Sequence, residues 1–372
     1  MPVEGYSGVR GMTEFYNPVK AVFGPGSFDK LPELIANRVY AIVTYDETFS
    51  MQLVRRLEDA GRGAAIIINN VKANPDFPEV KAGCEELKKL PKFPEVFVGL
   101  GGGSAIDTAK ALAVSGGDWE LLKEHLITGG GRADELKKPS IIAVPTNAGT
   151  GSEMSLGAVI WDRANGGKWG VRSNYGFPEY AVVDPELTLT LPRDQTISTG
   201  LDALSHALES IWQTNRNFIT QPIAEQAARS VIRFLPLLVD DLANLELRTT
   251  MSAAAMKAGI ALSQTRTSIA HQLSYDLSLN YGVPHGIACG FSLPMVMSWS
   301  IGFDRNCDES LKTIFGDNLD SGVRDFEKFF DRLGVSRNPT TYGPTKNQWE
   351  KMVMDAASNT KGKNFLGKPK FP

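Results

Sequence analysis

The sequence predicts an α/β domain followed by an all-α domain. Over the first half, short β-branched apolar runs alternate with segments of helical periodicity, which is the pattern of βαβ units around a parallel sheet. After Pro192 the strand signal largely disappears, and the remaining segments carry helical periodicity with few glycines. A chain of 372 residues is also long enough for two domains. We therefore expect one domain over 1–190 and a second over 191–372.

The elements follow from hydrophobic periodicity. In the first domain, strands with their following loops are expected at 39–45, 64–71, 96–104, 140–153 and 180–192, and helices at 47–61, 78–90 and 105–114. In the second domain, helices are expected at 196–215, 218–245, 247–279, 286–303, 321–334 and 347–359.

Two segments interrupt the alternation of the first domain. The turn at Ala164-Asn165-Gly166-Gly167 lies between two apolar runs and predicts a β hairpin. Residues 115–139 are polar and broken by glycines, so we expect a surface excursion in which His125 is a solvated side chain.

Composition and charge exclude several classes of protein. Hydrophobic residues make up 42% and charged residues 22%, which is ordinary for a globular protein and argues against a disordered chain. The net charge of −3 offers no basic surplus for nucleic acid, and no run of about 18 apolar residues predicts a membrane span. Cys84, Cys289 and Cys307 are odd in number and lack C-x-x-C spacing, which disfavours a disulfide scaffold and fits the cytoplasm.

Two glycine-rich loops follow apolar runs. Gly101-Gly102-Gly103-Ser104 opens the helix expected at 105–114, where backbone N–H groups can approach a phosphate. The spacing is not G-x-G-x-x-G, and tight turns use glycine for purely structural reasons about as often. The second loop, 146–152, adds hydroxyl and amide groups suited to ribose and pyrophosphate. Two such loops at the carboxyl ends of strands favour a nucleotide site.

Asp46 ends the first of these strands and has two interpretations. A carboxylate at that place accepts a hydrogen bond from a ribose 2′-hydroxyl and favours NAD over NADP. The alternative, at least as well supported, is an N-cap for the helix that begins at Glu47.

One carboxylate and three imidazoles in the second domain suggest a metal site. Asp202 and His206 are four residues apart in a helical segment, so they share one helix face. His271 lies in a second helical segment, and His285 follows in Val-Pro-His-Gly. Such a set suits iron or zinc. The alternative is a capping aspartate and three unrelated histidines, but an unpaired imidazole in apolar sequence is costly.

The segments GGGSAIDTAKA, PTNAGTGSE, DPELTLTLP, GLDALSHALE and the stretch from His271 to PHG resemble the iron-dependent (group III) alcohol dehydrogenases. The resemblance runs in order from about residue 15 to about residue 365. It implies the architecture shared with dehydroquinate synthase: a Rossmann-like NAD(P)-binding domain, here 1–190, and a helical metal-binding domain, here 191–372. The family's metal ligands fall on the same four residues, Asp202, His206, His271 and His285.

The resemblance also implies a cofactor site and a reaction. Cofactor contacts fall on Asn74, Gly103, Ser104, Thr146, Asn147, Thr150, Val159 and Lys168. We add Asp46 from the end of the first strand, and Gly102 and Asp107 from the first glycine loop and its helix. The implied reaction is reduction of an aldehyde by NAD(P)H at Fe²⁺ or Zn²⁺. The preference for NADH rests on Asp46 at the end of the first strand. Many members carry a second histidine four residues after the third ligand, where this chain has Tyr275. Tyr275 is a candidate proton donor to the product, and a cofactor hydroxyl or water is the alternative.

Within the family, TRTSIAHQLSYDLSLNYGVPHG and KGKNFLG are most similar to the phosphonoacetaldehyde reductases. That branch implies reduction of phosphonoacetaldehyde to 2-hydroxyethylphosphonate in phosphonate natural-product biosynthesis. A dianionic phosphonate needs cationic partners, and Arg266 is the first candidate, followed by Arg172.

Three alternatives to this function stay open. A general short-chain alcohol dehydrogenase differs only in substrate. A sugar-phosphate cyclase of the dehydroquinate synthase type would recycle NAD within each turnover. A non-catalytic binding protein on the same scaffold would not need the four candidate ligands. We expect a cytoplasmic homodimer that acts on a small aldehyde or alcohol and binds neither nucleic acid nor membrane.

Overall fold

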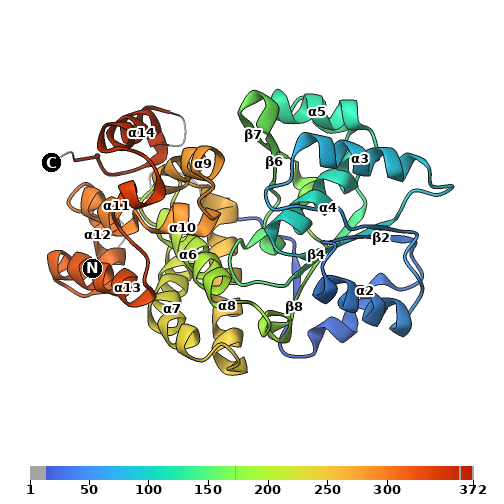
Figure 1. Ribbon diagram of the computed structural model, residues 1–372, viewed down its shortest axis with the longest axis horizontal. Coiled ribbons are helices and arrows are strands. Elements are labelled where there is room, and N and C mark those ends of the chain that lie inside the picture. Colours follow the sequence, from blue (N-terminus) through green and yellow to red (C-terminus); the bar gives the residue numbers. More distant parts are fainter. Residues whose placement is uncertain (1–13, 172, 360–361, 371–372) are drawn as a thin grey trace, which may run out of the picture. The chain divides into compact units, whose positions relative to one another are not determined.

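The computed structural model describes residues 14–171, 173–359 and 362–370 (Figure 1). The chain forms two compact units, which we name the sheet unit and the helical unit. The sheet unit comprises Asn17–Asn147 and Ser152–Leu189. The helical unit comprises the chain from Thr190 onward, together with Ala148–Gly151 and the described residues 14–16. The domain boundary after residue 190 stays a prediction; residues 14–16 and four residues of the second glycine loop belong to the helical unit.

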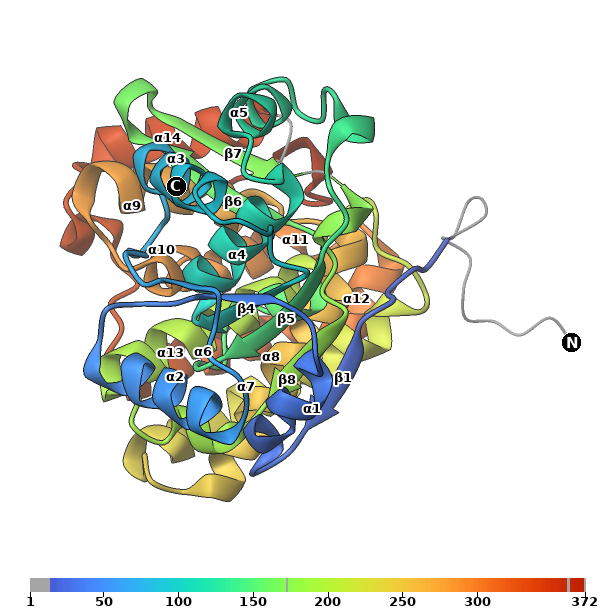
Figure 2. The same cartoon turned by 90° about the vertical axis from the view of Figure 1, so that its right-hand side faces the viewer.

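The sheet unit contains a six-stranded parallel sheet in the order β1-β8-β5-β4-β2-β3 (Figures 1 and 2). Its strands are β1 (Lys20–Phe23), β2 (Tyr40–Val43), β3 (Ile66–Ile68), β4 (Val96–Gly101), β5 (Ser140–Pro145) and β8 (Tyr180–Val183). Strand β1 was not expected from the sequence, because it is short and largely exposed. A parallel sheet needs helical crossovers, which the alternating sequence pattern supplies.

Helices cover both faces of this sheet. The helices are α1 (Leu31–Ile35), α2 (Thr48–Ala60), α3 (Phe77–Lys88), α4 (Gly103–Ser115) and α5 (Trp119–Ile127). Val98 and Leu100 of β4 pack in one core with residues of α1 and α2, whereas Phe97 packs in a second core with residues of α3, α4 and α5. Alternate residues of a strand point to opposite faces, so a strand that is apolar throughout serves both cores.

The predicted hairpin is present, and the predicted surface excursion is wrong. Strands β6 (Ala158–Asp162) and β7 (Gly167–Val171) pair antiparallel around the turn. Within 115–139, helix α5 buries Trp119 and His125. His125 is 0% exposed, and its Nδ1 lies 2.8 Å from the Gly131 carbonyl oxygen. The segment looks polar because the charged residues of α5 face outward, while one helical stripe packs into the core.

The helical unit contains nine helices in the described part of the chain. They are α6 (Arg193–Glu209), α7 (Thr220–Asp240), α8 (Leu245–Thr265), α9 (Ile269–Tyr281), α10 (His285–Gly290), α11 (Leu293–Ser300), α12 (Arg305–Phe315), α13 (Leu319–Leu333) and α14 (Lys346–Ser358). Helices α6, α7 and α8 pack on one another, and α10 packs on α6 (Figure 1). Helix α6 is almost wholly buried after Gly200, which makes it the centre of this unit.

Two expected helices are each broken into two. The segment 247–279 divides at Arg266, whose φ of 77° ends α8, and the segment 286–303 divides between α10 and α11. Periodicity continues across a break when both pieces bury the same kind of side chain, so sequence pattern alone does not show it.

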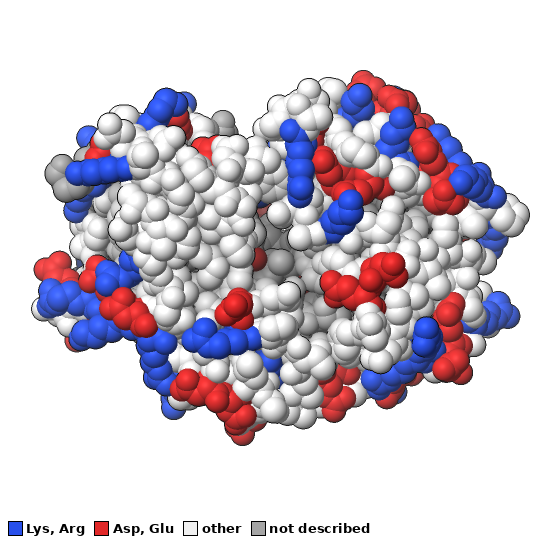
Figure 3. Space-filling view, in the orientation of Figure 1, with Lys and Arg blue, Asp and Glu red and all other residues white. Residues whose placement is uncertain are grey.

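Charges of both signs are interspersed on the face drawn in Figure 3, with lysine and arginine next to aspartate and glutamate. Among the described residues, no helix combines the length and apolar character needed to cross a membrane.

Candidate functional site

The four predicted metal ligands come together inside the helical unit. Asp202 and His206 lie on α6, His271 on α9, and His285 is the first residue of α10. From Asp202 Oδ1, the Nε2 atoms of His206, His271 and His285 are 3.4, 3.6 and 3.9 Å away. Asp202, His206 and His271 are each no more than 5% exposed, whereas His285 is partly exposed.

The contact between α10 and α6 depends on two glycines. A Cβ on Gly286 would overlap the carbonyl oxygen of Ser198, and a Cβ on Gly290 would lie 2.8 Å from Leu201 Cβ. Because α10 lacks side chains at these positions, its backbone approaches α6 closely and brings His285 to Asp202. The glycine in the Pro-His-Gly motif is therefore a packing requirement of the site.

The donor atoms fit a divalent transition metal. Ligand atoms around a tetrahedral zinc ion are roughly 3.3–3.8 Å apart, which follows from metal–ligand distances of about 2.0–2.3 Å. The observed separations from Asp202 Oδ1, 3.4–3.9 Å, are close to this range. Asp202 Oδ1 and His271 Nε2 are also buried, and neither has a hydrogen-bond partner among the residues that the structure describes. Buried polar atoms are normally paired, and a cation bound between these two atoms would satisfy both of them.

The electrostatics of the cluster support the same interpretation. Burial raises the pKa of Asp202, but the surrounding His206, His271 and His285 outweigh burial and hold that pKa below its usual value. Burial lowers the pKa of His206, which keeps its imidazole neutral with a lone pair to donate. Burial likewise opposes a charged His271, but Cys289, Glu209 and Asp202 outweigh it and raise the pKa of His271. A proton and a metal cation therefore compete for His271.

Glu209 completes the cluster and was missed by the sequence analysis. It is 0% exposed, and its Oε2 lies 2.7 Å from His271 Nδ1. Its two carboxylate oxygens also accept hydrogen bonds from the backbone N–H groups of Ser268, Ala270 and His271. Glu209 therefore caps the start of α9 and turns His271 Nε2 toward Asp202, as carboxylates behind metal-bound histidines commonly do.

A pattern in the sequence could have revealed Glu209. It lies seven residues after Asp202 and three after His206, and this spacing places all three on one face of α6. A buried acidic residue in an otherwise apolar helical stripe requires a partner. Here the partners are His271 and the backbone N–H groups at the break between α8 and α9.

Cys289 was also missed as a member of this cluster. It is buried on α10, one turn after His285, and its Sγ lies 3.6 Å from His285 Nε2. One potential ligand atom each from Asp202, His271, His285 and Cys289 lie within 4.8 Å of one another, a set that leaves out His206. This set and the predicted set of ligands share Asp202, His271 and His285, and they differ in whether Cys289 or His206 is the fourth member. The predicted set with His206 has a direct 3.4 Å contact to Asp202, so we keep His206 as a ligand.

The first glycine loop lies in the sheet unit, between β4 and α4. Gly101 has φ of 148°, and a Cβ there would lie 2.6 Å from the ring of Tyr45. Gly102 is the N-cap of α4, where the first N–H groups of a helix have no partner within the helix itself. The Tyr45 hydroxyl lies at this helix start, beside the backbone of Gly102 and Ala105. A Cβ on Gly102 would lie 2.6 Å from Asn147 Nδ2, so Asn147 is adjacent to this helix start.

The second glycine loop is divided between the two units. Thr146 and Asn147 belong to the sheet unit, whereas Thr150 belongs to the helical unit. In the helical unit, a Cβ on Gly149 would lie 2.7 Å from Thr199 Cβ on α6, and a Cβ on Gly151 would overlap Gly259 on α8. The glycines of this loop are thus explained by close packing on two helices.

Asp107 and Val159, both predicted to contact the cofactor, bind each other. The Val159 N–H and the Ser152 hydroxyl donate to the two carboxylate oxygens of Asp107, at 2.8 and 2.6 Å. Lys110, one turn later on α4, is 0% exposed and donates to the carbonyl oxygens of Ser152, Ser155 and Gly157. These bonds tie the segment 152–159 to α4.

The remaining predicted cofactor residues lie around α4 and the hairpin. Ser104 Oγ accepts a hydrogen bond from the N–H of Asn74, a residue with φ of 59°. Lys168 on β7 lies with its Nζ 4.9 Å from the centre of the Trp161 ring. The backbone N–H of Thr146 donates to the carbonyl of Gly101, which joins the two loops in the sheet unit.

The helix-cap interpretation of Asp46 is wrong. Helix α2 begins at Thr48, its N-cap is Glu47, and no side chain caps it. Asp46 is exposed and accepts a hydrogen bond from Asn69 Nδ2 at 3.1 Å. Because Asp46 does not cap α2, ribose binding is the remaining interpretation of this carboxylate.

The candidate catalytic and substrate residues differ in their surroundings. Tyr275 lies one turn after His271 on the same face of α9 and is half-buried. Arg266 is exposed at the end of α8, and its guanidinium has no hydrogen bond or ion pair within the described part of the chain. Arg172 lies outside the described residues.

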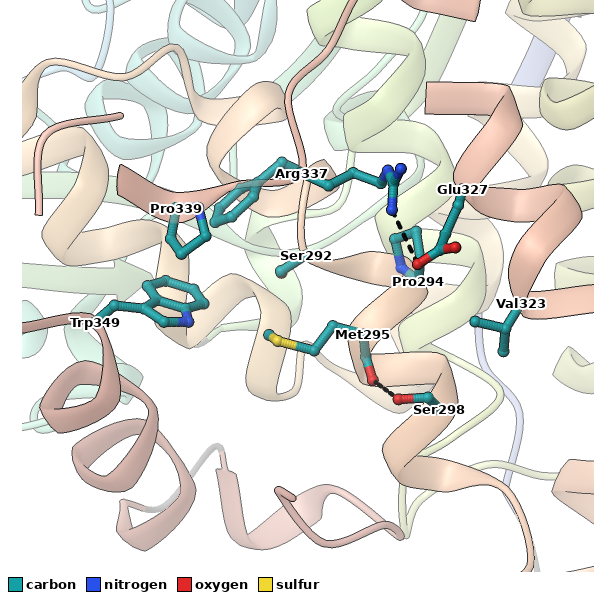
Figure 4. Close-up of a pocket in the computed structure, with 10 residues that line it drawn as sticks. Ser292, Pro294, Met295, Ser298, Val323, Glu327, Arg337, Pro339 and Trp349 are labelled. Carbon is teal, nitrogen blue, oxygen red and sulfur yellow. Dashed lines mark hydrogen bonds and ion pairs between the residues drawn. The ribbon is translucent and has the colours of Figure 1, made fainter. Parts of the chain in front are cut away.

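A separate cavity of about 270 Å³ lies in the helical unit among α11, α13 and α14 (Figure 4). None of the predicted site residues lines it. Its Arg337 pairs with Glu327 and Asp331, at 2.9 and 3.2 Å, so the charge of the arginine is already compensated. This cavity is distinct from the metal cluster.

Comparisons with known proteins agree with this geometry. The family model "Iron-containing alcohol dehydrogenase" matches residues 18–185, and "Fe-containing alcohol dehydrogenase family, C-terminal" matches residues 196–368. A 1-propanol dehydrogenase of Citrobacter freundii is 31% identical over 291 residues, which cover 78% of this chain and 74% of that protein. A sulfoacetaldehyde reductase of Bilophila wadsworthia is 30% identical over 318 residues, which cover 82% and 78%.

A solved structure supports the same relationship. The sulfoacetaldehyde reductase of Bifidobacterium kashiwanohense, in complex with NAD⁺, superimposes with a TM-score of 0.87 at 29% identity and covers 97% of this chain and 95% of that one. The paired family models, the identity to relatives and the buried Asp-His cluster lead to one assignment. The chain belongs to the iron-containing alcohol dehydrogenase family, and it is a metal-dependent, NAD(P)-linked oxidoreductase that interconverts aldehydes and alcohols.

Proposed function

We propose that this enzyme reduces phosphonoacetaldehyde to 2-hydroxyethylphosphonate with NADH, in phosphonate natural-product biosynthesis. The convergence of Asp202, His206, His271 and His285 around unpaired buried atoms carries the reductase part of the proposal. Two of the relatives named above act on sulfoacetaldehyde, which also carries a tetrahedral anion one carbon away from the aldehyde. That similarity supports an anionic two-carbon aldehyde as the substrate.

Each group of residues has a distinct task in this reaction. Asp202 and the three histidines hold the divalent ion, and Glu209 orients His271. The ion, when bound, supplies a Lewis acid that polarises a carbonyl oxygen. The helix start at Gly102 and Gly103 binds the cofactor pyrophosphate, so that the nicotinamide can donate hydride. Tyr275 is the proposed proton donor to the product oxygen.

Arg266 is the proposed partner of the phosphonate. Arg266 lies five residues before His271 in sequence, and its guanidinium has no hydrogen bond or ion pair to any of the described residues. Its φ of 77° and ψ of 170° are unfavourable for any residue but glycine, and such strain is found mostly where function requires it. Arg172 remains a second proposal that the described residues do not address.

Asp46 supports the preference for NADH. Its carboxylate at the end of β2 accepts only from Asn69 among the hydrogen bonds observed, and it would repel the 2′-phosphate of NADPH. The NAD⁺ bound in the related sulfoacetaldehyde reductase agrees with this choice.

A substrate panel tests the proposal. NADH and NADPH oxidation would be measured with phosphonoacetaldehyde, sulfoacetaldehyde and propanal. We expect the highest kcat/KM with phosphonoacetaldehyde and NADH, and stoichiometric consumption of the cofactor. Preference for propanal would indicate a general short-chain alcohol dehydrogenase instead. The similarity to a 1-propanol dehydrogenase supports this second candidate function. Cofactor recycling without net consumption would instead indicate a cyclase.

Replacement of Arg266 tests the substrate contact. Loss of one charge-assisted hydrogen bond costs about 1.5–3 kcal/mol, so Arg266→Ala should lower kcat/KM for phosphonoacetaldehyde roughly ten- to a hundred-fold. The rate with propanal should change little. An equal loss with both substrates would mean that Arg266 supports the start of α9 instead.

The homodimer and the cytoplasmic location are also proposals, and both rest on the sequence alone. Light scattering during size-exclusion chromatography measures the first, and cell fractionation the second.

A further inference from the structure

Cys289 occupies an unusual place for a cysteine that has no assigned role. It is 0% exposed on α10, and its Sγ lies 3.7 Å from His285 Nδ1 and 3.6 Å from His285 Nε2. A potential ligand atom from each of Asp202, His271, His285 and Cys289 lies within 4.8 Å of the other three. The sulfur therefore belongs to the same cluster as the predicted metal ligands.

Two buried atoms beside the sulfur are short of a partner. Asp202 Oδ1 and His271 Nε2 are both buried, and within the described ranges of the chain they make no hydrogen bond. Cys289 Sγ lies 3.6 Å from His285 Nε2, which is less than the sum of the usual metal–sulfur and metal–nitrogen distances, about 2.3 and 2.1 Å. With the four ligands already assigned, the sulfur would be a fifth donor. A cation at this place would contact the sulfur as well as the nitrogen and oxygen donors.

We propose that Cys289 binds the metal through its sulfur and thereby shifts the preference of this site from iron toward zinc. The inference rests on the metal site of the proposed function. A thiolate is a softer ligand than a carboxylate or an imidazole, and soft sulfur ligands favour zinc. When the sulfur binds, the thiol proton leaves to solvent and no electron is transferred.

The two other cysteines provide matched comparisons. Cys307 lies in the helical unit on α12 and is 0% exposed, and burial raises its pKa to about 12. Cys84 lies in the sheet unit with its Sγ 3.5 Å from Ser115 Oγ, and burial raises its pKa to about 11. Neither belongs to the cluster of potential ligands around Asp202. All three cysteines are buried, so burial alone does not distinguish Cys289 from them.

Cobalt provides a direct readout that does not depend on activity. Co²⁺ would be added to the metal-depleted full-length enzyme, and the near-ultraviolet absorption of a sulfur-to-cobalt charge transfer would be recorded. We expect the band in the wild type and in Cys307→Ser, and its loss in Cys289→Ser. The affinity for Zn²⁺, measured by competition with a chelator, should fall at least about tenfold in Cys289→Ser, whereas the affinity for Fe²⁺ should fall less.

The possible outcomes separate this inference from the proposed function. Cobalt that binds with a visible d–d spectrum but without the charge-transfer band overturns the role of Cys289 and leaves the Asp-His site intact. Cobalt that does not bind to the wild type overturns the metal site itself. If Cys289→Ser does not fold, the double variant Cys84→Ser, Cys307→Ser decides, because Cys289 is then the only thiol. The band must persist in that protein, and its absence contradicts the proposal.

Discussion

The metal cluster of the helical unit and the glycine turn of the sheet unit are built on opposite principles. The cluster consists of side chains from three helices, held in place by Glu209, whose carboxylate bonds both to His271 and to the start of α9. The turn between β4 and α4 consists of backbone, and it depends on the absence of side chains at Gly101 and Gly102. The cluster should therefore be sensitive to the loss of particular atoms, and the turn to the addition of atoms.

The largest effect is expected from a direct ligand. In His271→Ala, the metal content measured by elemental analysis should fall below half of the wild-type value, and activity should fall by more than about 100-fold. Replacing a residue that only orients a ligand already lowers metal affinity or activity about 10–100-fold, so loss of a ligand should lower them more. His125→Ala is the control, since it removes a buried histidine of the sheet unit that lies outside the cluster. Undiminished metal content with near-normal turnover in His271→Ala would contradict the assignment.

The second effect concerns Glu209, which acts through His271. In Glu209→Gln, metal affinity should fall about 10–100-fold, because an amide is a weaker acceptor for His271 Nδ1–H and for three backbone N–H groups. Glu246→Gln on the exposed start of α8 is the control. Chelator competition measures the affinity, and equal values for the two variants would limit Glu209 to a role in helix capping.

Glu209 also predicts a pH dependence of the stability of the protein without metal. Burial raises the pKa of Glu209, but the neighbouring His271 and the backbone N–H groups outweigh burial and lower it. A lowered carboxyl pKa contributes stability above the unfolded value, near pH 4, and this contribution is lost as the pH falls through the folded value. As the pH falls below about 4, the melting temperature of Glu209→Gln should therefore decrease less steeply than that of the wild type. Thermal unfolding of the two metal-free proteins over this pH range measures the difference.

The third effect tests the glycine turn. A Cβ on Gly102 would lie 2.6 Å from Asn147 Nδ2, so Gly102→Ala should displace Asn147 and raise the KM for NADH several-fold while the metal content stays unchanged. Gly157→Ala is the matched control, because a Cβ there meets nothing within 4 Å and its φ is not positive. Loss of metal from Gly102→Ala would show that the two regions are not independent.

The smallest effect is expected at Asp46, which is proposed to favour NADH over NADPH without being required for cofactor binding. Asp46→Ala should raise the activity with NADPH relative to NADH, because the carboxylate no longer repels a 2′-phosphate. Stability should change little, since Asp46 is exposed and does not cap α2. An unchanged ratio of kcat/KM for the two cofactors would remove Asp46 from the cofactor site.

The sequence by itself determined the features that depend on local pattern. The parallel order of alternating strands and helices, the hairpin at 158–171 and the helical second unit all follow from periodicity and turn residues. Asp202 and His206 were found because a spacing of four residues places them on one helix face, a property that any helix has. Chemically distinctive residues such as histidine are also rare enough in this chain to be noticed.

Only the tertiary structure decided which distant residues complete the site. Cys289 looks like an ordinary member of an apolar helix, and the spacing of Glu209 shows its helix face but not its partner. Their contacts with His285 and His271 appear only when α9 and α10 pack beside α6. His125 was misassigned because charged neighbours mask a buried helical stripe. Packing of this kind depends on contacts between residues far apart in the chain. Local periodicity reports which face of an element is buried, but it carries no information about the partner against which that face is buried.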